Sequence, residues 1–377
     1  MLAIGWILSI MVQHVYAEEK VVCTLGDNLH ISGTVKLAGQ CRYLTTIRID
    51  SSNTSLDCAG AVIDGEGKRS IGIEVESSGK PLTNIEIRNC VVVNARHRGI
   101  SIGWSAPDRR KTESFDRGAL YSVHPSDVRL TNVTVLRSGI VGIYVDDYVT
   151  DTLIYKSRVE ESGGVGIYLE HSSVGTNIKD SAILHNGFAL HREGISIDSS
   201  RNNIVSGSRI AGNYAGGIYV YRNCSEHLNE DPKQVLRWQS ADKNLLEDND
   251  ISGGRTGIWI ASRQSMDVSM MQCGNGYYAE GKHTLDSAKF NTISRNRIQN
   301  TDFGIIVEDD FNLIDGNVIK HVSNIAIKVG SVPREKYLGL PVKMVRLIGN
   351  RFENVHEKVI RVGNSDVEIS PFIEPDD

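Results

Sequence analysis

One short phrase returns along most of this chain: a glycine, an isoleucine, a variable residue, an aliphatic residue and then polar residues. It is clearest as GIYVDD at 142–147, GIYLEH at 166–171, GISIDS at 194–199, GIYVYR at 217–222, GIWIAS at 257–262 and GIIVED at 304–309. Gly166 follows Gly142 by 24 residues, and Gly217 follows Gly194 by 23. Self-similarity at a period of about 20–50 residues indicates a solenoid, in which each repeat packs only on its neighbours.

A second repeated phrase lies between copies of the first. It is NNIVSGSRI at 202–210, KNLLEDNDI at 243–251, FNTISRNRI at 290–298 and FNLIDGNVI at 311–319. Each copy predicts two short strands joined by a tight turn, because aliphatic residues are bounded by Asn, Asp, Gly and Arg. Together with the glycine–isoleucine phrase, this gives three short strands per repeat. We therefore predict an all-β fold, a parallel β-helix.

Asparagine recurs at one position of these turns, as Asn249, Asn296, Asn317 and Asn350. Asn tolerates the left-handed conformation of a sharp turn, so we expect it there. Stacked on successive coils, the amides are also expected to hydrogen-bond as a ladder.

The composition fits a narrow solenoid and limits the partners. Of the 377 residues only 6% are aromatic, and 36 are glycine, which suits a thin core of stacked aliphatic side chains. A net charge of −5 lacks the basic character of a nucleic-acid-binding protein, so we expect no nucleic-acid partner. The oligomeric state is left open.

The N-terminus predicts export. Residues 2–12 form an apolar run too short to span a bilayer comfortably, and Val15, Tyr16 and Ala17 precede a charged stretch. We expect a signal peptide at 1–17, cleaved after Ala17, although a retained anchor or a buried strand is the alternative. The mature chain would then be secreted or periplasmic, with no membrane span. We expect a cap and first strands at 18–54, the β-helix at 55–365 and a tail at 366–377.

Six cysteines follow the predicted cleavage site, an even number that allows disulfides in an exported protein. Their positions along the repeats favour three local pairs: Cys23 with Cys41, Cys58 with Cys90, and Cys224 with Cys273. Their spacing matches no zinc signature, so we expect no metal ligation through sulfur.

Three insertions interrupt the repeats, at 104–127, 223–242 and 263–289. Each follows a glycine–isoleucine strand, so all three would leave the stack at one corner. Insertions gathered on one side of a repeat protein usually mark its binding side, although solenoids also tolerate loops at little cost.

The outward side chains of the repeated strand suggest a sugar-binding surface. Alternation along a strand places the isoleucine and the next aliphatic residue inside and the residues between them outside. The outer positions give candidate substrate-binding aromatics, Tyr144, Tyr168, Tyr219, Tyr221 and Trp259. Aromatic faces with polar edges suit sugar rings, but stacked aromatics also stabilise strands without any ligand.

Acidic residues share this surface and supply the candidate catalytic groups. Asp146, Glu170 and Asp198 recur at one repeat position. Like charges on adjacent strands destabilise a sheet, and a local cost of this kind is expected at functional sites. Carboxyl groups one or two coils apart lie about 5 or about 10 Å apart, which spans the separations that glycosidases use. The full candidate catalytic set is Asp146, Asp147, Glu170, His171, Asp198 and Arg222. No metal ligand is predicted with them, although the cluster Glu308, Asp309 and Asp310 could hold Ca²⁺.

The repeats from about 50 to 365, with SLDCAGAVIDG at 55–65, resemble the right-handed β-helix proteins of the pectate-lyase-like superfamily. The resemblance implies a single-stranded right-handed parallel β-helix with long loop insertions on one side, and work on carbohydrates. Asp146 and Asp147 look like the paired aspartates of the polygalacturonase-like hydrolases. The DPHD motif of the alginate epimerases does not occur. The fold alone does not choose the reaction.

Three functions remain open. The leading hypothesis is an exported enzyme that cleaves a polysaccharide or oligosaccharide along the Tyr144–Trp259 surface, by hydrolysis or by β-elimination. In hydrolysis the carboxylates would act as acid and base; in lyase or C5-epimerase chemistry a tyrosine or His171 would remove the proton and Arg222 would neutralise the uronate. The acidic strip disfavours a polyuronate, which favours hydrolysis. The alternative is a non-catalytic carbohydrate-binding or assembly protein.

Overall fold

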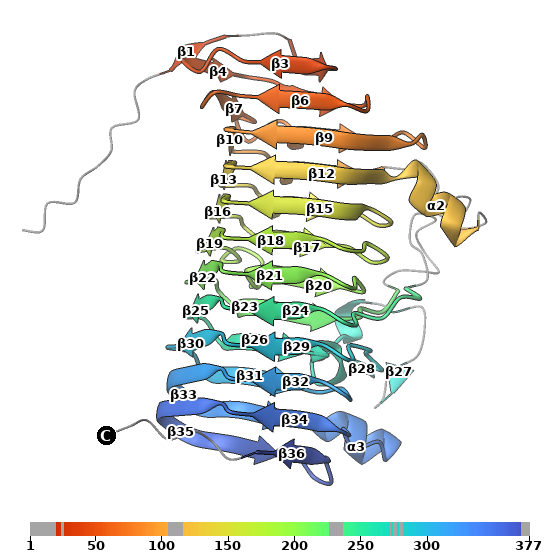
Figure 1. Ribbon diagram of the computed structural model, residues 1–377, viewed down its shortest axis with the longest axis vertical. Coiled ribbons are helices and arrows are strands. Elements are labelled where there is room, and N and C mark those ends of the chain that lie inside the picture. The colour runs from red at the N-terminus through yellow and green to blue at the C-terminus, as the bar shows by residue number, and fades with distance from the viewer. Residues whose placement is uncertain are drawn as a thin grey trace, which may run out of the picture.

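The computed structural model describes residues 20–23, 26–104, 116–225, 237–271, 273, 277–278 and 282–370. Over these residues the chain winds into coils stacked along one axis, with the first strands at one end and the last at the other (Figure 1). The predicted signal peptide lies outside the described residues. Among the helices that are described, none is long and apolar enough to cross a membrane.

Each complete coil contributes one strand to each of three parallel stacks. The first stack is the 12-stranded sheet β3 (Thr34–Lys36), β6 (Thr54–Asp57), β9 (Leu82–Arg88), β12 (Pro125–Thr131), β15 (Thr150–Tyr155), β18 (Asn177–Lys179), β21 (Ile204–Ser206), β24 (Leu245–Glu247), β29 (Thr292–Ser294), β32 (Leu313–Asp315), β34 (Val345–Ile348) and β36 (Val367–Ile369). The second is β1 (Val21–Val22), β4 (Cys41–Tyr43), β7 (Val62–Asp64), β10 (Val91–Val93), β13 (Thr134–Leu136), β16 (Arg158–Glu160), β19 (Ala182–Leu184), β22 (Arg209–Ala211), β25 (Asp250–Ser252) and β30 (Arg297–Gln299). The third, which we call the GIxV sheet, is β2 (Asn28–Ile31), β5 (Thr46–Ile49), β8 (Ile71–Glu76), β11 (Arg98–Gly103), β14 (Val141–Val145), β17 (Ile167–Leu169), β20 (Ile195–Asp198), β23 (Gly216–Tyr221), β26 (Thr256–Ile260) and β31 (Phe303–Val307).

In the last coils the second and third stacks merge, because β33 (Val318–Val329) and β35 (Arg351–Arg361) each run through both. The remaining elements are the helices α2 (Arg117–Val123) and α3 (Val332–Leu338), the short 3₁₀ helices η1 (Ser262–Gln264) and η2 (Ser269–Met271), and the hairpin β27 (Tyr277–Tyr278) and β28 (His283–Thr284). The predicted three strands per coil are confirmed.

The register keeps like residues above one another. Ile100 pairs with Ile143, and Ile143 pairs with Ile167, so the isoleucines of the GIxV sheet form a column. These side chains are fully buried and belong to one continuous core of Ile, Val and Leu that runs through the stack. The alternation predicted from the sequence therefore holds, and the variable residues of the GIxV sheet lie on its outer face.

The asparagine ladder is confirmed, with one correction. The Asn296 Oδ1 accepts from the backbone N–H and side-chain Nδ2 of Asn249, at 3.1 and 2.9 Å, and the same pattern continues through Asn317 and Asn350. The left-handed conformation, however, belongs to the residue before each asparagine: Asp248, Arg295, Gly316 and Gly349. That residue turns the chain so that the following amide points into the stack, where both of its polar atoms are satisfied.

The three predicted disulfides are present, joining Cys23 to Cys41, Cys58 to Cys90 and Cys224 to Cys273. Two of the three predicted insertions leave the stack on one side, as predicted: α2 and the β27–β28 hairpin both project from the right-hand edge in Figure 1. Helix α3 projects from the same side, and the sequence analysis did not single it out.

Candidate functional site

The outer face of the GIxV sheet aligns the predicted aromatic residues. Tyr144 pairs with Ser101 on one side and with Tyr168 on the other, and farther along Tyr219 pairs with Trp259. The rings of Tyr144 and Tyr168 are stacked with their centroids 5.7 Å apart. These tyrosines therefore form a short ladder, whose fixed spacing comes from the register of the strands.

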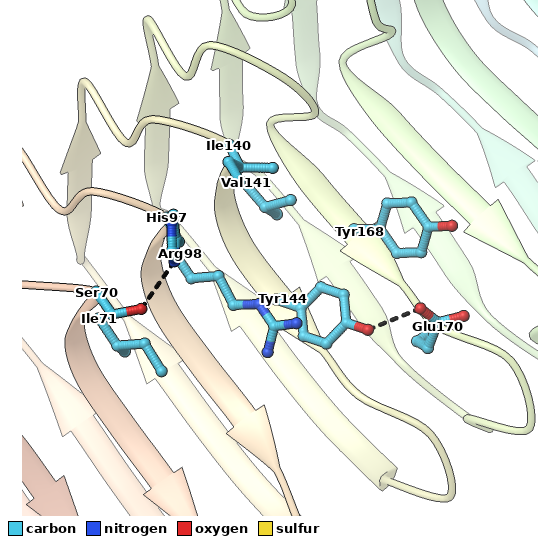
Figure 2. Close-up of a pocket in the computed structure, with 9 residues that line it drawn as sticks. All are labelled: Ser70, Ile71, His97, Arg98, Ile140, Val141, Tyr144, Tyr168 and Glu170. Carbon is cyan, nitrogen blue, oxygen red and sulfur yellow. Dashed lines mark hydrogen bonds between the residues drawn. The ribbon is translucent and has the colours of Figure 1, made fainter. Parts of the chain in front are cut away.

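A cavity of about 450 Å³ opens at this tyrosine ladder (Figure 2). Strands β8, β11, β14 and β17, with the turns that precede them, line it. The residues in its wall are Ser70, Ile71, His97, Arg98, Ile140, Val141, Tyr144, Tyr168 and Glu170. Three of the predicted site residues, Tyr144, Tyr168 and Glu170, thus meet in one open cavity.

Arg98, Tyr144 and Glu170 form a connected group in this cavity. The Arg98 guanidinium lies over the Tyr144 ring, 3.7 Å from its centroid, and the Tyr144 hydroxyl donates to the Glu170 Oε2 at 2.7 Å. Figure 2 shows Arg98 reaching from His97 toward Tyr144. The His97 Nδ1 lies 2.9 Å from the Ser70 Oγ. A cation, a phenol and a carboxylate therefore converge with an imidazole nearby.

Arg237, from the end of the second insertion, lies behind this group. Its Nη1 bonds to Glu170 and lies 2.9 Å from the Asp198 Oδ2. Asp198 also accepts from the Tyr168 hydroxyl at 2.7 Å. Each carboxylate thus binds one tyrosine of the ladder and shares one arginine, which compensates the like charges that the sequence placed side by side.

The two carboxyl groups have shifted pKa values of opposite direction. Burial alone would raise the pKa of Glu170, but Arg237 and His171 outweigh burial and hold it well below its usual range. Burial raises the pKa of Asp198, and Glu170 reinforces the rise while Arg237 opposes it. Glu170 is accordingly the ionised member of the pair, and Asp198 is the more easily protonated one.

Asp146, Asp147 and His171 lie at the adjoining corner rather than in the cavity wall. All three are buried; the His171 Nε2 lies 3.7 Å from the Asp147 Oδ2, and the His171 Nδ1 lies 3.2 Å from the Ser172 Oγ. The Tyr148 hydroxyl beside them accepts from the Trp238 indole at 3.2 Å. This group nevertheless contacts the cavity wall, because the His171 backbone N–H donates to the Glu170 Oε1 at 2.9 Å.

The other predicted residues lie farther along, beneath the insertions. The Arg222 guanidinium donates to the Leu285 carbonyl at 2.9 Å. Tyr219 and Tyr221 are buried, and Trp259 is half-buried. The Arg263 guanidinium stacks 3.9 Å above the Tyr221 ring. These groups hold the insertions against the sheet.

The acidic cluster after β31 is bound by basic side chains. Arg334 of α3 contacts the Asp309 Oδ1 at 2.9 Å and the Asp310 Oδ1 at 3.0 Å, and the Lys289 Nζ lies 3.1 Å from the Asp310 Oδ2. No group of three or more metal-ligating side chains occurs among the residues that the structure describes. The sequence allowed Ca²⁺ at this cluster, and in the structure basic side chains bind two of its three carboxylates, Asp309 and Asp310.

Comparison with known proteins agrees with this architecture. A family profile described as "Right handed beta helix region" matches residues 111–231. Among solved structures, the mannuronan C-5 epimerase AlgE6 A-module of Azotobacter vinelandii is 14% identical, with a TM-score of 0.56 over 97% of this chain and 92% of that one. A variant of the periplasmic alginate epimerase AlgG is 12% identical, with a TM-score of 0.57 over 92% and 76%.

A variant catalytic domain of a GH87 α-1,3-glucanase in complex with nigerose is 11% identical, with a TM-score of 0.51 over 94% of this chain and 64% of that one. The fold is therefore a right-handed parallel β-helix. No curated protein matches the sequence of this β-helix, and likeness at these identities concerns the fold alone.

Three residues of the site escaped the sequence analysis: His97, Arg98 and Arg237. Arg98 occupies the position before the repeat glycine, where its paired neighbours on the β-helix are Ile71 and Val141. A charge between two apolar neighbours at this position was the available signal. Arg237 gave none, because it reaches the sheet from an insertion without a repeat.

Proposed function

We propose that this β-helix is an exported enzyme acting on polyuronates, as a polysaccharide lyase or a uronate C5-epimerase. The observation that carries the proposal is the convergence of Arg98, Tyr144 and Glu170 in an open cavity. Both reactions begin with removal of the proton on C5, α to the uronate carboxylate. That step needs a cation for the carboxylate and a positioned acid and base.

Arg98 supplies the cation. A uronate carboxylate bound to its guanidinium is neutralised, which stabilises the negative charge that develops when the C5–H bond breaks. Arg98 stands between His97 and Tyr144 in the cavity (Figure 2). A uronate held there has an imidazole on one side and a phenol on the other.

His97 and Tyr144 are the proposed base and acid. In elimination, His97 takes the C5 proton, the C4–C5 double bond forms as the bond from C4 to the glycosidic oxygen breaks, and Tyr144 protonates the departing oxygen. In epimerisation, Tyr144 returns a proton to C5 from the opposite face. Glu170 acts through Tyr144: its ionised carboxylate fixes the phenol in place.

The acidic strip, which disfavoured a polyuronate in the sequence, is compensated at this cavity. Arg237 bonds to both Glu170 and Asp198, and Arg98 adds a further positive charge beside Tyr144.

Three disulfides support export, because such bonds persist in oxidising compartments.

Glycoside hydrolysis is the second candidate. It is supported by the opposite pKa shifts of Glu170 and Asp198, since a glycosidase pairs a carboxyl group of lower pKa with one of raised pKa. Against it, Asp198 is fully buried and Arg237 fills the space between the two groups. A sugar oxygen would have to displace that arginine.

Products distinguish these reactions. The purified protein is incubated in D₂O with polymannuronate, polyguluronate, polygalacturonate and neutral glucans. A lyase yields the ultraviolet absorbance of a 4,5-unsaturated uronate, and an epimerase yields deuterium at C5 without chain shortening. New reducing ends without that absorbance indicate hydrolysis, and binding without turnover indicates a non-catalytic protein. Either of the last two results overturns the proposal.

A further inference from the structure

An exposed group of aromatic rings lies on the turns that precede the GIxV strands. We call Phe188, His191 and Tyr214 the aromatic platform. The His191 and Tyr214 rings are stacked with centroids 4.4 Å apart, and Phe188 meets Tyr214 edge-on at 5.8 Å. Phe188 is 58% exposed and Tyr214 is 45% exposed. Clustered apolar rings in water are costly, which makes the platform a candidate binding surface.

The platform depends on an enlarged turn. The turn between β19 and β20 spans 185–194, whereas the corresponding turns before β14 and β23 span only 137–140 and 212–215. Backbone hydrogen bonds hold the enlarged turn: the N–H groups of Ala189 and Leu190 both donate to the Gly163 carbonyl. The extra residues therefore present Phe188 and His191 from a fixed support.

Two exposed apolar side chains, Ile140 and Leu190, lie between the platform and the cavity, and we call them the apolar track. Ile140 lies in the cavity wall and is 42% exposed. The N–H of Gly164, on the next coil, donates to the Ile140 carbonyl, and Leu190, on the coil after that, packs over Gly164 and is 51% exposed. The cavity, the track and the platform follow one another along the axis, from the coil of β14 to that of β23.

We infer that the platform is a second sugar subsite, which stacks a pyranose ring of the same polysaccharide chain that enters the cavity. The inference rests on the proposed function. Sugar rings present apolar C–H faces that suit Tyr and Phe. Successive coils rise by about 4.8 Å, close to the length of one sugar in an extended chain, so a polymer lying along the axis can reach both sites. Continuity with the cavity favours this occupant over a separate protein.

The same molecule contains a matched comparison. Phe290 and Phe311 form another exposed stacked pair, with centroids 5.0 Å apart. They precede β29 and β32, at a different corner of the coil. The aromatic platform and the Phe290–Phe311 pair are alike in exposure and stacking. If only the platform contributes to substrate binding, the reason is therefore its position beside the cavity.

The test compares Phe188→Ala, Tyr214→Ala and their double variant with Phe290→Ala. For a long polyuronate, we expect KM to rise about tenfold in the double variant. The kcat, and the KM for short oligouronates that fill only the cavity, should not change. Phe290→Ala should match the wild type throughout, and Tyr214→Leu, which keeps apolar bulk, should show whether the ring itself is needed.

A wild-type KM for the polymer in the double variant overturns the inference, as does a change in oligomeric state, which would make a second copy the occupant. Calorimetric titration of each protein with polyuronate and with neutral glucan separates the two proposals. If the wild type binds only the glucan and the double variant loses that binding, the platform stands and the polyuronate proposal fails. If the wild type binds neither polymer, both fail.

Discussion

The two halves of the GIxV sheet carry equivalent residues in different surroundings. In the N-terminal half, Tyr144 and Tyr168 border an open cavity. In the C-terminal half, Tyr219 occupies the same column and is buried to a similar degree (4% exposed, against 7% for Tyr144), but its hydroxyl donates to the Ala215 carbonyl at 2.8 Å. Here η1 and α3 lie against the sheet: Gln264 and Arg334 both donate to the Glu308 carbonyl. A repeat position therefore does not fix a role; the insertions decide which coils remain accessible.

The carboxyl groups that follow the GIxV strands also differ between the open N-terminal half and the covered C-terminal half of the sheet. In the open half, burial would raise the pKa of Glu170, but Arg237, His171 and the hydrogen bonds to its carboxylate together lower it. In the covered half, burial raises the pKa of Glu308 to about 8, with only weak opposition from Ser265 and Lys328. Asp286, also buried there, has a pKa raised to about 7. Glu170 is therefore an ionised carboxylate at neutral pH, whereas Glu308 keeps its proton there.

Removing the shared arginine should have the largest effect. Arg237→Gln leaves Glu170 and Asp198 buried together without their cation, so the free energy of unfolding at neutral pH should fall by about 3–5 kcal/mol. Denaturant unfolding measures this. The loss should shrink in acid, because the stability that a lowered carboxyl pKa provides disappears as pH falls through that pKa.

Arg129→Gln is the control for this measurement. Arg129 pairs with Asp127 at 3.0 Å, but its side chain is 57% exposed, so the expected cost is about 0–1 kcal/mol. Equal losses for the two variants would mean that Arg237 is no more important to the fold than a surface arginine.

Matched tyrosine variants test the difference in accessibility. Tyr144→Phe removes the phenolic proton that we assign to the reaction, so kcat on a polyuronate should fall by about 10²–10³-fold. Tyr219→Phe, in the same column, should change kcat by less than about twofold, because the Tyr219 hydroxyl bonds to the Ala215 carbonyl and the Thr256 side chain and to no group of the cavity wall that we assign to the reaction. Both melting temperatures are recorded alongside. Comparable losses of kcat would show that the covered half takes part in catalysis.

The sequence predicted the architecture because each coil repeats the same local rules. Alternation in GIYVDD placed Ile143 in the core and Tyr144 outside, and the asparagine column foretold the ladder. The position of the cavity depends on contacts between distant segments, which no repeat encodes. Arg237 lies 67 residues from Glu170 in the chain, so the compensation of the acidic strip was not visible in the pattern. Likewise, Tyr144 and Tyr219 look alike in sequence, but the Tyr144 hydroxyl binds Glu170 and the Tyr219 hydroxyl binds the Ala215 carbonyl.

The raised pKa of Glu308 predicts a pH dependence of stability. Between the ordinary carboxyl pKa and about 8, the folded state keeps a proton that the unfolded state releases, so the free energy of unfolding should decrease as pH rises through this range and level off above it. Glu308→Gln should remove most of this slope and stabilise the protein at about pH 9 by roughly 2–4 kcal/mol. Urea unfolding at about pH 5 and about pH 9 checks both points.

Asp286 should leave a smaller slope of the same sign in Glu308→Gln, since its pKa is also raised. Glu86→Gln serves as the control, because Glu86 forms a half-exposed pair with Arg88 in the first sheet. If Glu308→Gln unfolds with the wild-type pH dependence, the covered half does not hold this acid protonated.

The two halves also differ in the column of hydrogen-bonded side chains at the turns between the first and second stacks. In the open half it consists of hydroxyls: the Ser157 N–H donates to the Ser181 Oγ, and the Ser181 N–H donates to the Ser208 Oγ. In the covered half the same column continues as asparagines, and the Asn296 Nδ2 makes an additional bond to the Leu246 carbonyl at 2.8 Å.

Asn296→Ser should keep an acceptor for Asn249 but lose that additional bond, at a cost of about 1 kcal/mol in denaturant unfolding. Asn296→Ala, which also leaves the Asn249 N–H unpaired, should cost roughly twice as much. If the serine variant is as stable as the wild type, an amide adds nothing to a hydroxyl at this position. The two halves would then differ only in what covers them and not in how their turns are held.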